Sequence, residues 1–203
     1  MIYDIQSLRI KYSMYSNINQ KISLEAKIGN LVRIKKGLYT DDLLADCPLI
    51  SNICYEPSYL SFEYALSFYG LIPEYVSMYT AACFNKKNNK KYIVNNICFE
   101  YRSVPDEVFP HGISFMKSES GIRYKIASKE KALCDTLYSK YPVRTIKELK
   151  ILLFDDLRID ENEFLNLDFK SIEEIAPLYH SNTLLTLKNY LKGLKNANIW
   201  TNY

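Results

Sequence analysis

Apolar residues near the start of the chain recur at helical spacing in two separate stretches. The first stretch covers residues 4–11, where Ile5 and Leu8 would face inward, and a polar turn follows it. The second covers residues 16–28, and Gly29 provides a natural C-terminal cap. Its apolar seam consists of Ile18, Ile22 and Ala26. We therefore predict two short helices joined by a turn.

The spacing then changes to alternation. Residues 31–39 read Leu-Val-Arg-Ile-Lys-Lys-Gly-Leu-Tyr, with apolar and polar positions alternating on both sides of a Lys-Lys-Gly turn. Two short alternating segments around such a turn predict a β-hairpin. Because Arg33, Lys35 and Lys36 lie in it, the hairpin is expected to be basic.

A connector with short helical pieces is predicted for residues 41–56, which contain an acidic pair and a proline. A helix follows, which Ser58 or Ser61 would cap and Gly70 would end. This helix is rich in aromatic residues. Because base-stacking surfaces interleave exposed aromatics with charge, the aromatic residues here favour a core role.

Alternation returns at residue 76. Segments 76–84 and 92–104 predict two strands joined by the polar loop 85–91. Further strands at 113–117 and 122–126 would complete an antiparallel sheet of about four strands. The loop contains Lys86, Lys87, Lys90 and Lys91, which form either a solvated loop tip or a second contact for phosphates or an acidic partner.

Residues 128–141 predict a helix that packs on this sheet, with Ser128 as its N-cap and Pro142 ending it. Glu130 falls within the apolar arc of this helix, where the dipole of the first turn favours negative charge. The arc contains Leu133, Cys134, Leu137, Tyr138 and Tyr141. Four further helices are predicted in the tail, at residues 145–154, 160–165, 171–179 and 182–194.

Charge is distributed unevenly along the 203 residues. The net charge is +3, but residues 1–40 carry seven basic and two acidic groups, so the remainder is slightly negative. An apolar content of 48% is that of a folded protein. A small basic module joined to a near-neutral larger one is typical of a phosphate-binding head on a protein-binding body.

The order helix, turn, polar-faced helix and basic hairpin is that of a winged helix-turn-helix. We expect an α+β protein with a winged helix-turn-helix over residues 1–42, followed by a C-terminal domain over 43–203 with a small antiparallel sheet and packed helices. The second helix would enter the major groove, where amides pair with base edges, and the hairpin would contact phosphates. The candidate DNA-binding residues are Asn17, Asn19, Gln20, Ser23, Lys27, Arg33, Lys35 and Lys36.

Two features depart from this pattern. Such domains normally have another helix ahead of the helix-turn-helix, and Glu25 lies near the inward side of the second helix. Leu24 and Ile28 flank it and widen the apolar arc. They would either cover a surface that the missing helix fills or form a contact between protomers.

Motifs for catalysis are weak. Ser128-Lys-Glu-Lys131 matches S-x-x-K formally, but S-D-N and K-T-G elements are absent. Phosphate-binding glycine loops and H-E-x-x-H are also absent, and five cysteines without a C-x-x-C pair do not suggest a zinc site. We expect no catalytic residue, no cofactor and no metal site. With no apolar run of about 20 residues and no secretory signal, a cytoplasmic protein is expected.

Three segments resemble the antitoxin of AbiE-type abortive-infection systems, a family of transcriptional regulators of viral defence. They are Gly-Asn-Leu-Val-Arg-Ile-Lys-Lys-Gly-Leu-Tyr at 29–39, Pro-Ser-Tyr-Leu-Ser at 57–61 with Gly-Leu-Ile-Pro at 70–73, and Ile-Ala-Ser-Lys-Glu-Lys-Ala-Leu-Cys-Asp at 126–135.

The resemblance implies a type IV toxin–antitoxin system active in phage defence. Its N-terminal part would bind inverted repeats in double-stranded promoter DNA and repress its own operon. Its C-terminal part would counteract a nucleotidyltransferase-like toxin encoded nearby, without a stable complex. Two alternatives remain: a stand-alone winged-helix regulator, and a protein-interaction module that has lost DNA binding.

Overall fold

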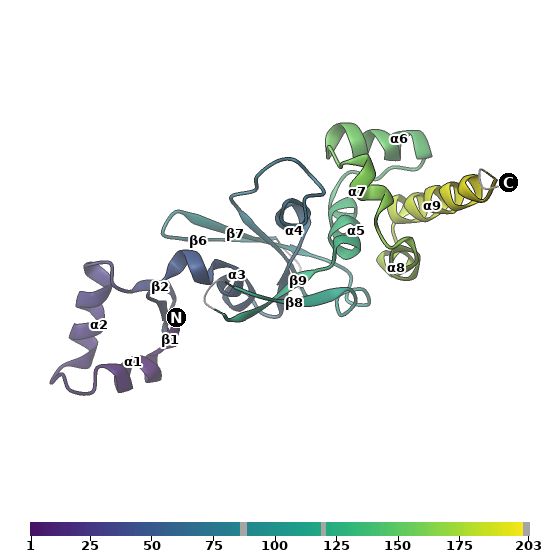
Figure 1. Ribbon diagram of the computed structural model, residues 1–203. Helices are drawn as coiled ribbons and strands as arrows, with labels where there is room; N and C mark the ends of the chain where they lie inside the picture. Colours follow the sequence, from purple (N-terminus) through teal and green to yellow (C-terminus); the bar gives the residue numbers. More distant parts are fainter. Residues whose placement is uncertain (86–88, 119–120, 201–203) are drawn as a thin grey trace.

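The computed structural model describes residues 1–85, 89–118 and 121–200. These residues form an α+β architecture, with a small sheet near the N-terminus and a larger mixed sheet at the centre (Figure 1). Helices cover both faces of the larger sheet.

The N-terminal unit contains both predicted helices, the predicted hairpin, and one strand that the sequence pattern did not reveal. Its elements are β1 (Ile2–Asp4), α1 (Ile5–Lys11), α2 (Ile18–Lys27), β2 (Val32–Lys35) and β3 (Leu38–Thr40). The three strands form an antiparallel sheet in the order β1-β3-β2. Asp4 joins β1 to α1, and its carboxylate caps the helix by accepting a 2.7 Å hydrogen bond from the Ser7 amide.

A small apolar core holds this unit together. Leu8, Ile22 and Leu31 are buried in it. Ile34 of the hairpin packs elsewhere, in a second cluster with Cys47 and Ile50 of the next helix. The hairpin therefore attaches the N-terminal unit to the rest of the chain.

That next helix, α3 (Leu43–Cys54), replaces the connector predicted for residues 41–56. It is continuous through Pro48, which removes one backbone hydrogen bond from the helix. Complete burial of Cys47 and Ile50 offsets this loss. The predicted domain boundary between residues 42 and 43 falls directly before α3.

The helix predicted from Ser58 begins later, because residues 58–60 form a strand. β4 (Ser58–Leu60) lies between two other strands, and α4 (Phe62–Phe68) follows it. Tyr59 and Leu60 are fully buried. A strand buried on both faces shows no alternation, so the sequence pattern gave no sign of it.

The larger sheet has six strands in the order β6-β7-β5-β4-β9-β8. The prediction of a small antiparallel sheet was wrong, because β5 pairs with β7 and β4 with β9 in parallel. The predicted strand over 92–104 is instead a hairpin that turns at Asn95 and Asn96, both with positive φ. The remaining strands are β5 (Tyr79–Cys83), β6 (Lys90–Val94), β7 (Ile97–Ser103), β8 (Ile113–Lys117) and β9 (Arg123–Ala127).

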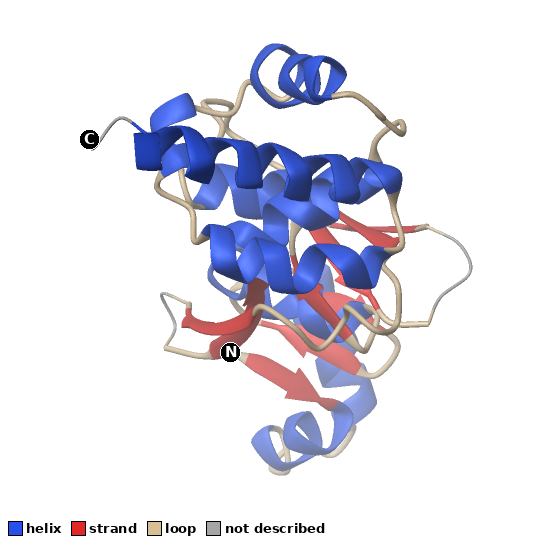
Figure 2. Cartoon of the chain, turned by 90° about the vertical axis from the view of Figure 1, so that its right-hand side faces the viewer, coloured by secondary structure: helices blue, strands red, loops and turns tan. Residues whose placement is uncertain are grey.

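Alternate residues of β5 face different helices. Ala81 and Cys83 pack with α3, whereas Ala82 belongs to the main core on the other face. Figure 1 shows α3 on one side of the sheet and α4 and α5 on the other. The C-terminal helices lie beyond α5 and stand in front of the strands when seen from that end (Figure 2).

The C-terminal part is helical, as predicted. It contains α5 (Lys129–Ser139), α6 (Ile146–Lys150), a π-helical turn η1 (Ile151–Asp156), α7 (Glu161–Leu165), α8 (Phe169–Ile175), a 3-10 helix η2 (Ala176–Tyr179) and α9 (Asn182–Trp200). Ser128 caps α5 as expected, since its hydroxyl accepts a hydrogen bond from the Lys131 amide at 3.2 Å.

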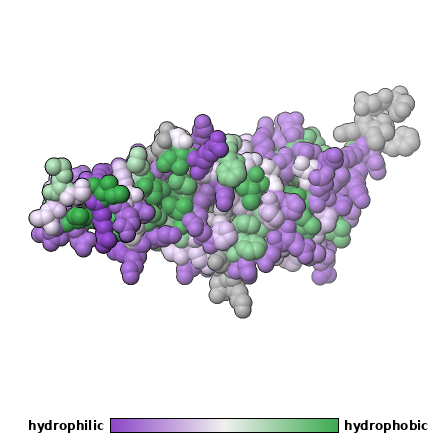
Figure 3. All heavy atoms as spheres, turned by 90° about the horizontal axis from the view of Figure 1, so that it is seen from below, coloured by the Kyte–Doolittle hydropathy of each residue, from purple (hydrophilic) through white to green (hydrophobic). Residues whose placement is uncertain are grey.

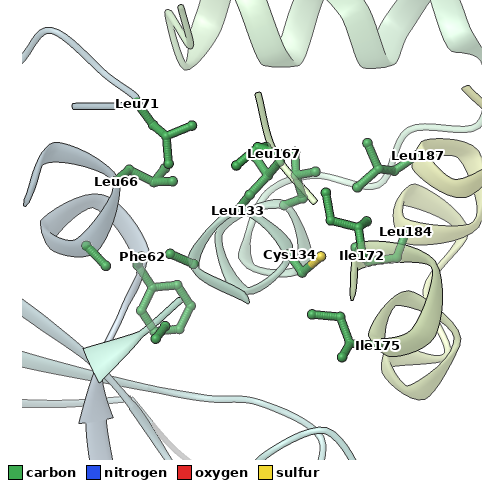
Figure 4. Packing of buried hydrophobic residues seen from close by; sticks show 14 of the residues in the cluster. Phe62, Leu66, Leu71, Leu133, Cys134, Leu167, Ile172, Ile175, Leu184 and Leu187 are labelled. Atoms are coloured by element: carbon green, nitrogen blue, oxygen red, sulfur yellow. The ribbon is translucent and has the colours of Figure 1, made fainter. Parts of the chain in front are cut away.

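Helix α5 is the centre of the main core. Figure 4 shows it between Phe62 and Leu66 of α4 on one side and Ile172 and Leu184 of the C-terminal helices on the other. Seven consecutive residues, 131–137, are buried.

The apolar arc predicted for α5 was therefore partly wrong. Tyr138 and Tyr141 are exposed, because they lie at and beyond the end of the enclosed segment. Glu130 is half-buried, and its carboxylate accepts a 3.1 Å hydrogen bond from the Asp168 amide ahead of α8.

Candidate nucleic-acid interface

Helix α2 presents a continuous polar strip to solvent. Asn19, Gln20, Ser23 and Lys27 are exposed and fall within an arc of about 100° at 3.6 residues per turn. Ile22 lies outside this arc, buried in the small core. The sequence-predicted residues of this helix are thus brought together on one face.

Asn17 differs from the other candidates because its side chain caps a helix. Its side-chain oxygen caps α2 by accepting a 3.1 Å hydrogen bond from the Gln20 amide. Its carbonyl oxygen is therefore committed to the helix, and its role is to start α2 at this position.

The apolar edge of α2 lies beside the polar strip. Leu24 is 48% exposed and Ile28 is 57% exposed, so neither is covered within this chain. Figure 3 shows apolar surface at the N-terminal end of the molecule among hydrophilic residues. A groove of about 310 Å³ runs from Tyr15 past Gln20 to Leu24.

Glu25 lies toward the inner side of α2 and is paired there. Lys21 contacts its carboxylate at 2.5 Å, and the Asn30 side chain donates to it at 2.8 Å. These two bonds, with Lys21 contributing more, lower the pKa of Glu25 below its ordinary value. The residue that departs from the expected apolar pattern is thus kept ionised by its neighbours.

The hairpin carries the remaining three candidates, all exposed. Arg33 and Lys36 have no ion pair within the part of the chain that the structure describes. Lys35 is different, since its ammonium donates a 2.6 Å hydrogen bond to the Ile53 carbonyl at the end of α3. Lys35 therefore fixes the hairpin against α3 in addition to presenting charge.

Ion pairs within the N-terminal unit neutralise some of its basic residues and leave others free to bind a partner. Lys21 is neutralised by Glu25, and Lys11 contacts Tyr3 at 3.0 Å and lies near Asp41, which together raise its pKa. Of the basic residues of the N-terminal unit, those without an ion pair among the described residues are Arg9, Lys27, Arg33, Lys35 and Lys36.

Of the second basic site predicted in loop 85–91, the structure describes only Lys90 and Lys91 among the four lysines. Lys86 and Lys87 lie outside the described residues. Lys90 and Lys91 belong to β6, and Lys91 pairs with Glu100 at 2.8 Å. This ion pair commits Lys91 to the sheet.

A buried polar network in the C-terminal part was not predicted. The Lys131 ammonium lies 3.0 Å from the Asp135 carboxylate, and both side chains are completely buried. The ammonium also donates to the Val108 carbonyl at 3.1 Å and to the Tyr179 hydroxyl at 2.9 Å. All three of its protons thus have acceptors.

Both carboxylate oxygens of Asp135 likewise have hydrogen-bond partners. Tyr179 donates to one carboxylate oxygen at 2.6 Å, while Ser61 at 2.6 Å and Tyr59 at 3.1 Å donate to the other. Burial, and next the nearby Asp135, raise the pKa of Tyr59 and Tyr179 well above the ordinary value, which keeps both phenols as donors. A closed network without exposed atoms holds β4, α5 and η2 together and offers no access to a substrate.

The S-x-x-K match is explained by this network. Ser128 accepts from the Lys131 backbone amide, and the Lys131 ammonium reaches Asp135, Tyr179 and Val108 instead of the Ser128 hydroxyl. The pair of side chains therefore lacks the contact that would activate a serine nucleophile.

Comparison with known proteins adds no identification. Neither a protein-family model nor a curated protein matches this sequence. The function must therefore be inferred from the residues and their geometry.

Two further findings concern metal binding and membrane spanning. The described residues contain no cluster of three or more His, Cys, Asp or Glu side chains that could hold a metal ion. Within the same part of the chain, every helix is too short or too polar to cross a membrane.

Proposed function

We propose that this protein is an antitoxin of the AbiE type, with two roles. Its N-terminal unit is a winged helix-turn-helix that binds inverted repeats in its own promoter and represses the operon. Its C-terminal part counteracts a nucleotidyltransferase-like toxin encoded nearby. The protein acts in the cytoplasm and is not an enzyme.

The observation that carries the DNA-binding half is the arrangement of α1, α2 and the β2–β3 hairpin. The ten residues of α2 expose Asn19, Gln20 and Ser23 on one side. A helix of this size fits the major groove, where Asn and Gln pair with adenine through two hydrogen bonds. The hairpin next to it adds unpaired cations for phosphates.

The buried network supports the likeness of the C-terminal part to the family. Tyr59 and Ser61 belong to the Pro-Ser-Tyr-Leu-Ser segment, and Lys131 and Asp135 belong to the Lys-Ala-Leu-Cys-Asp segment. The bonded residues lie 76 and 74 residues apart in sequence, yet their polar side chains bond directly. Two of the three segments that resemble the family therefore meet at the centre of the fold.

The base-reading role of α2 is tested by replacing Asn19 with Ala. We expect this variant to lose preference for operator DNA over scrambled DNA by about 1–3 kcal/mol, because a bidentate base contact is lost. Fluorescence anisotropy with labelled duplexes measures both affinities. Asn189→Ala, on the exposed side of α9, is the matched control and should leave the preference unchanged. If Asn19→Ala and Ser23→Ala both retained the full preference, α2 would not be the reading helix.

A specific observation favours a second candidate, a protein-interaction module without DNA binding. The exposed Leu24 and Ile28 lie directly beside the polar strip, on the helix that would enter the groove. An apolar edge suits a protein contact better than a phosphate backbone. In this version, mixing with any duplex leaves the anisotropy unchanged at low salt.

A further inference from the structure

A pocket of about 280 Å³ lies between α4 and the segment that leads from α4 to β5. Four aromatic side chains line it, those of Tyr64, Phe68, Tyr75 and Tyr79. The sequence favoured a core role for the aromatic residues of α4. Phe62 is fully buried, as that predicts, whereas Phe68 is 47% exposed. Tyr75, in the segment after α4, is 90% exposed, so the pocket opens to solvent between rings that no core covers.

Three aromatic rings follow one another in a stack that reaches this pocket. The ring centroids of Phe99 and Tyr79 lie 5.3 Å apart with an angle of 24° between the planes, and those of Tyr79 and Tyr64 lie 4.8 Å apart at 33°. Phe99 is fully buried at one end. The other end is Tyr64, which lines the pocket. Because offset-stacked rings attract one another, a further planar ring would extend the stack at Tyr64.

Hydrogen bonds hold the walls of the pocket in place. The Ser67 hydroxyl donates to the Glu74 carbonyl at 2.7 Å, which ties the residue before Tyr75 to α4. The Tyr64 amide donates to the Thr80 hydroxyl at 3.0 Å, which ties α4 to β5. The rings on both walls are thus positioned before a ligand arrives, and less conformational entropy is lost on binding.

The lining favours a flat, uncharged ligand. None of the seven described residues that line the pocket carries a formal charge, so neither a phosphate nor an ammonium group finds a counter-ion there. Ligand sites typically have volumes of about 300–1,000 Å³, so this smaller pocket suits a single ring system. Burial raises the pKa of Tyr64, which keeps its hydroxyl as a hydrogen-bond donor. A donor beside stacked rings suits the hydrogen-bonding edge of a nucleobase.

We propose that this pocket binds a single unpaired nucleobase, stacked on Tyr64 and flanked by Phe68 and Tyr75. The base belongs either to a free nucleoside or to a single-stranded nucleic acid whose phosphates stay outside the pocket. Every base is accepted, because each has a π-face that stacks on an aromatic side chain. This binding is independent of the proposed repression, since the bases of a duplex are already stacked on one another and do not enter the pocket.

Saturation-transfer NMR of the full chain with adenosine tests this binding. The base protons should receive saturation more strongly than the ribose protons and should shift upfield, because they lie over an aromatic ring. Tyr64→Leu keeps an apolar side chain but removes the ring, so adenosine should bind at least about five-fold more weakly, the lower end for the loss of one stacked base. Tyr64→Phe keeps the ring and should restore most of the affinity.

Matched controls separate the pocket from other surfaces. Tyr141→Leu removes an exposed ring outside the pocket and should leave adenosine binding unchanged. A short single-stranded oligonucleotide should displace adenosine, whereas a duplex of the same length should not. Tighter binding of the oligonucleotide than of adenosine assigns the base to a strand, and equal or weaker binding assigns it to a free nucleoside.

Three results would overturn this assignment. The first is that neither adenosine nor the single strand binds at millimolar concentrations. The second is that Tyr64→Leu, folded by circular dichroism, binds adenosine as tightly as the natural protein does. The third is that tetramethylammonium binds at Tyr64 and adenosine does not, which would make the pocket a cation site. Absence of duplex binding would instead contradict the proposed repression and leave this pocket unaffected.

Discussion

At the scale of single residues, Lys131 shows how local sequence misleads. Lys131 and Asp135 are four residues apart on a helix, a spacing typical of solvated surface pairs. Here both side chains are fully buried. The other hydrogen-bond partners of Asp135 lie 44 to 76 residues away along the chain. The apolar residues on every side of the pair were visible in the sequence. The partners that make burial of the charges tolerable were not.

Breaking this pair should be costly. We expect Lys131→Met to lower the free energy of unfolding by about 3–5 kcal/mol, because Asp135 is left buried without its cation. Urea denaturation measures the loss. Lys129, on the same helix as Lys131, forms a more exposed pair with Glu163 of α7, and Lys129→Met should cost less than about 1 kcal/mol. Equal losses for the two variants would contradict the structural role of the network.

Glu63 gives a prediction about pH. Burial alone would raise its pKa, but Arg102, which forms two bonds at 2.7 and 3.0 Å, and Lys140 at 2.9 Å overcome this and lower it. A lowered pKa in the folded state stabilises the protein above the ordinary value of 4.5, and this contribution disappears as the pH falls through the lower folded value.

Accordingly, the difference in unfolding free energy between the natural protein and Glu63→Gln should be largest near neutral pH and should shrink below about pH 4.5. Denaturation at a series of pH values measures it. Glu174→Gln, an exposed residue on α8, is the control and should show no such convergence. A gap that stays constant down to the acid-unfolding region would rule out the ion-pair explanation.

At the scale of elements, the sequence predicted what is local. The Ser128 cap acts within one turn of its own helix, and the Lys-Lys-Gly turn links adjacent residues. Strand pairing is not local, so the parallel pairing of β5 with β7 was missed. β4 was missed because a strand buried on both faces shows no alternation. The bond from the Ser61 hydroxyl to Asp135, 74 residues away, was equally invisible in the sequence.

The hairpin allows its two lysines to be distinguished. Lys36→Ala should reduce the salt slope of DNA binding by about one unit, equally for all sequences, because a phosphate contact is lost. Lys35→Ala should also loosen the hairpin, since Lys35 bonds the Ile53 carbonyl. We expect faster amide hydrogen exchange in β2 and β3 for Lys35→Ala and not for Lys36→Ala. If neither variant altered the salt slope, the hairpin would not touch DNA.

At the scale of the whole molecule, the N-terminal unit and the large core are joined through α3. One end of the molecule carries the exposed polar strip of α2, and the other carries the C-terminal helices (Figure 1). The sequence indicated this division through its charge, because the excess of basic residues lies in the first 40. It did not indicate that Lys35 of the hairpin bonds the Ile53 carbonyl of α3, since that depends on how α3 is placed.

The proposed repressor function is tested most directly by a mobility-shift titration of the full chain with its own upstream DNA. The titration is run at low and moderate salt, beside a scrambled duplex of equal length. We predict retardation of the upstream duplex at protein concentrations at least ten-fold lower than for the scrambled one, with an affinity that falls steeply as salt rises. Equal affinity for both duplexes, or none for either, would contradict the account and leave a protein-binding module.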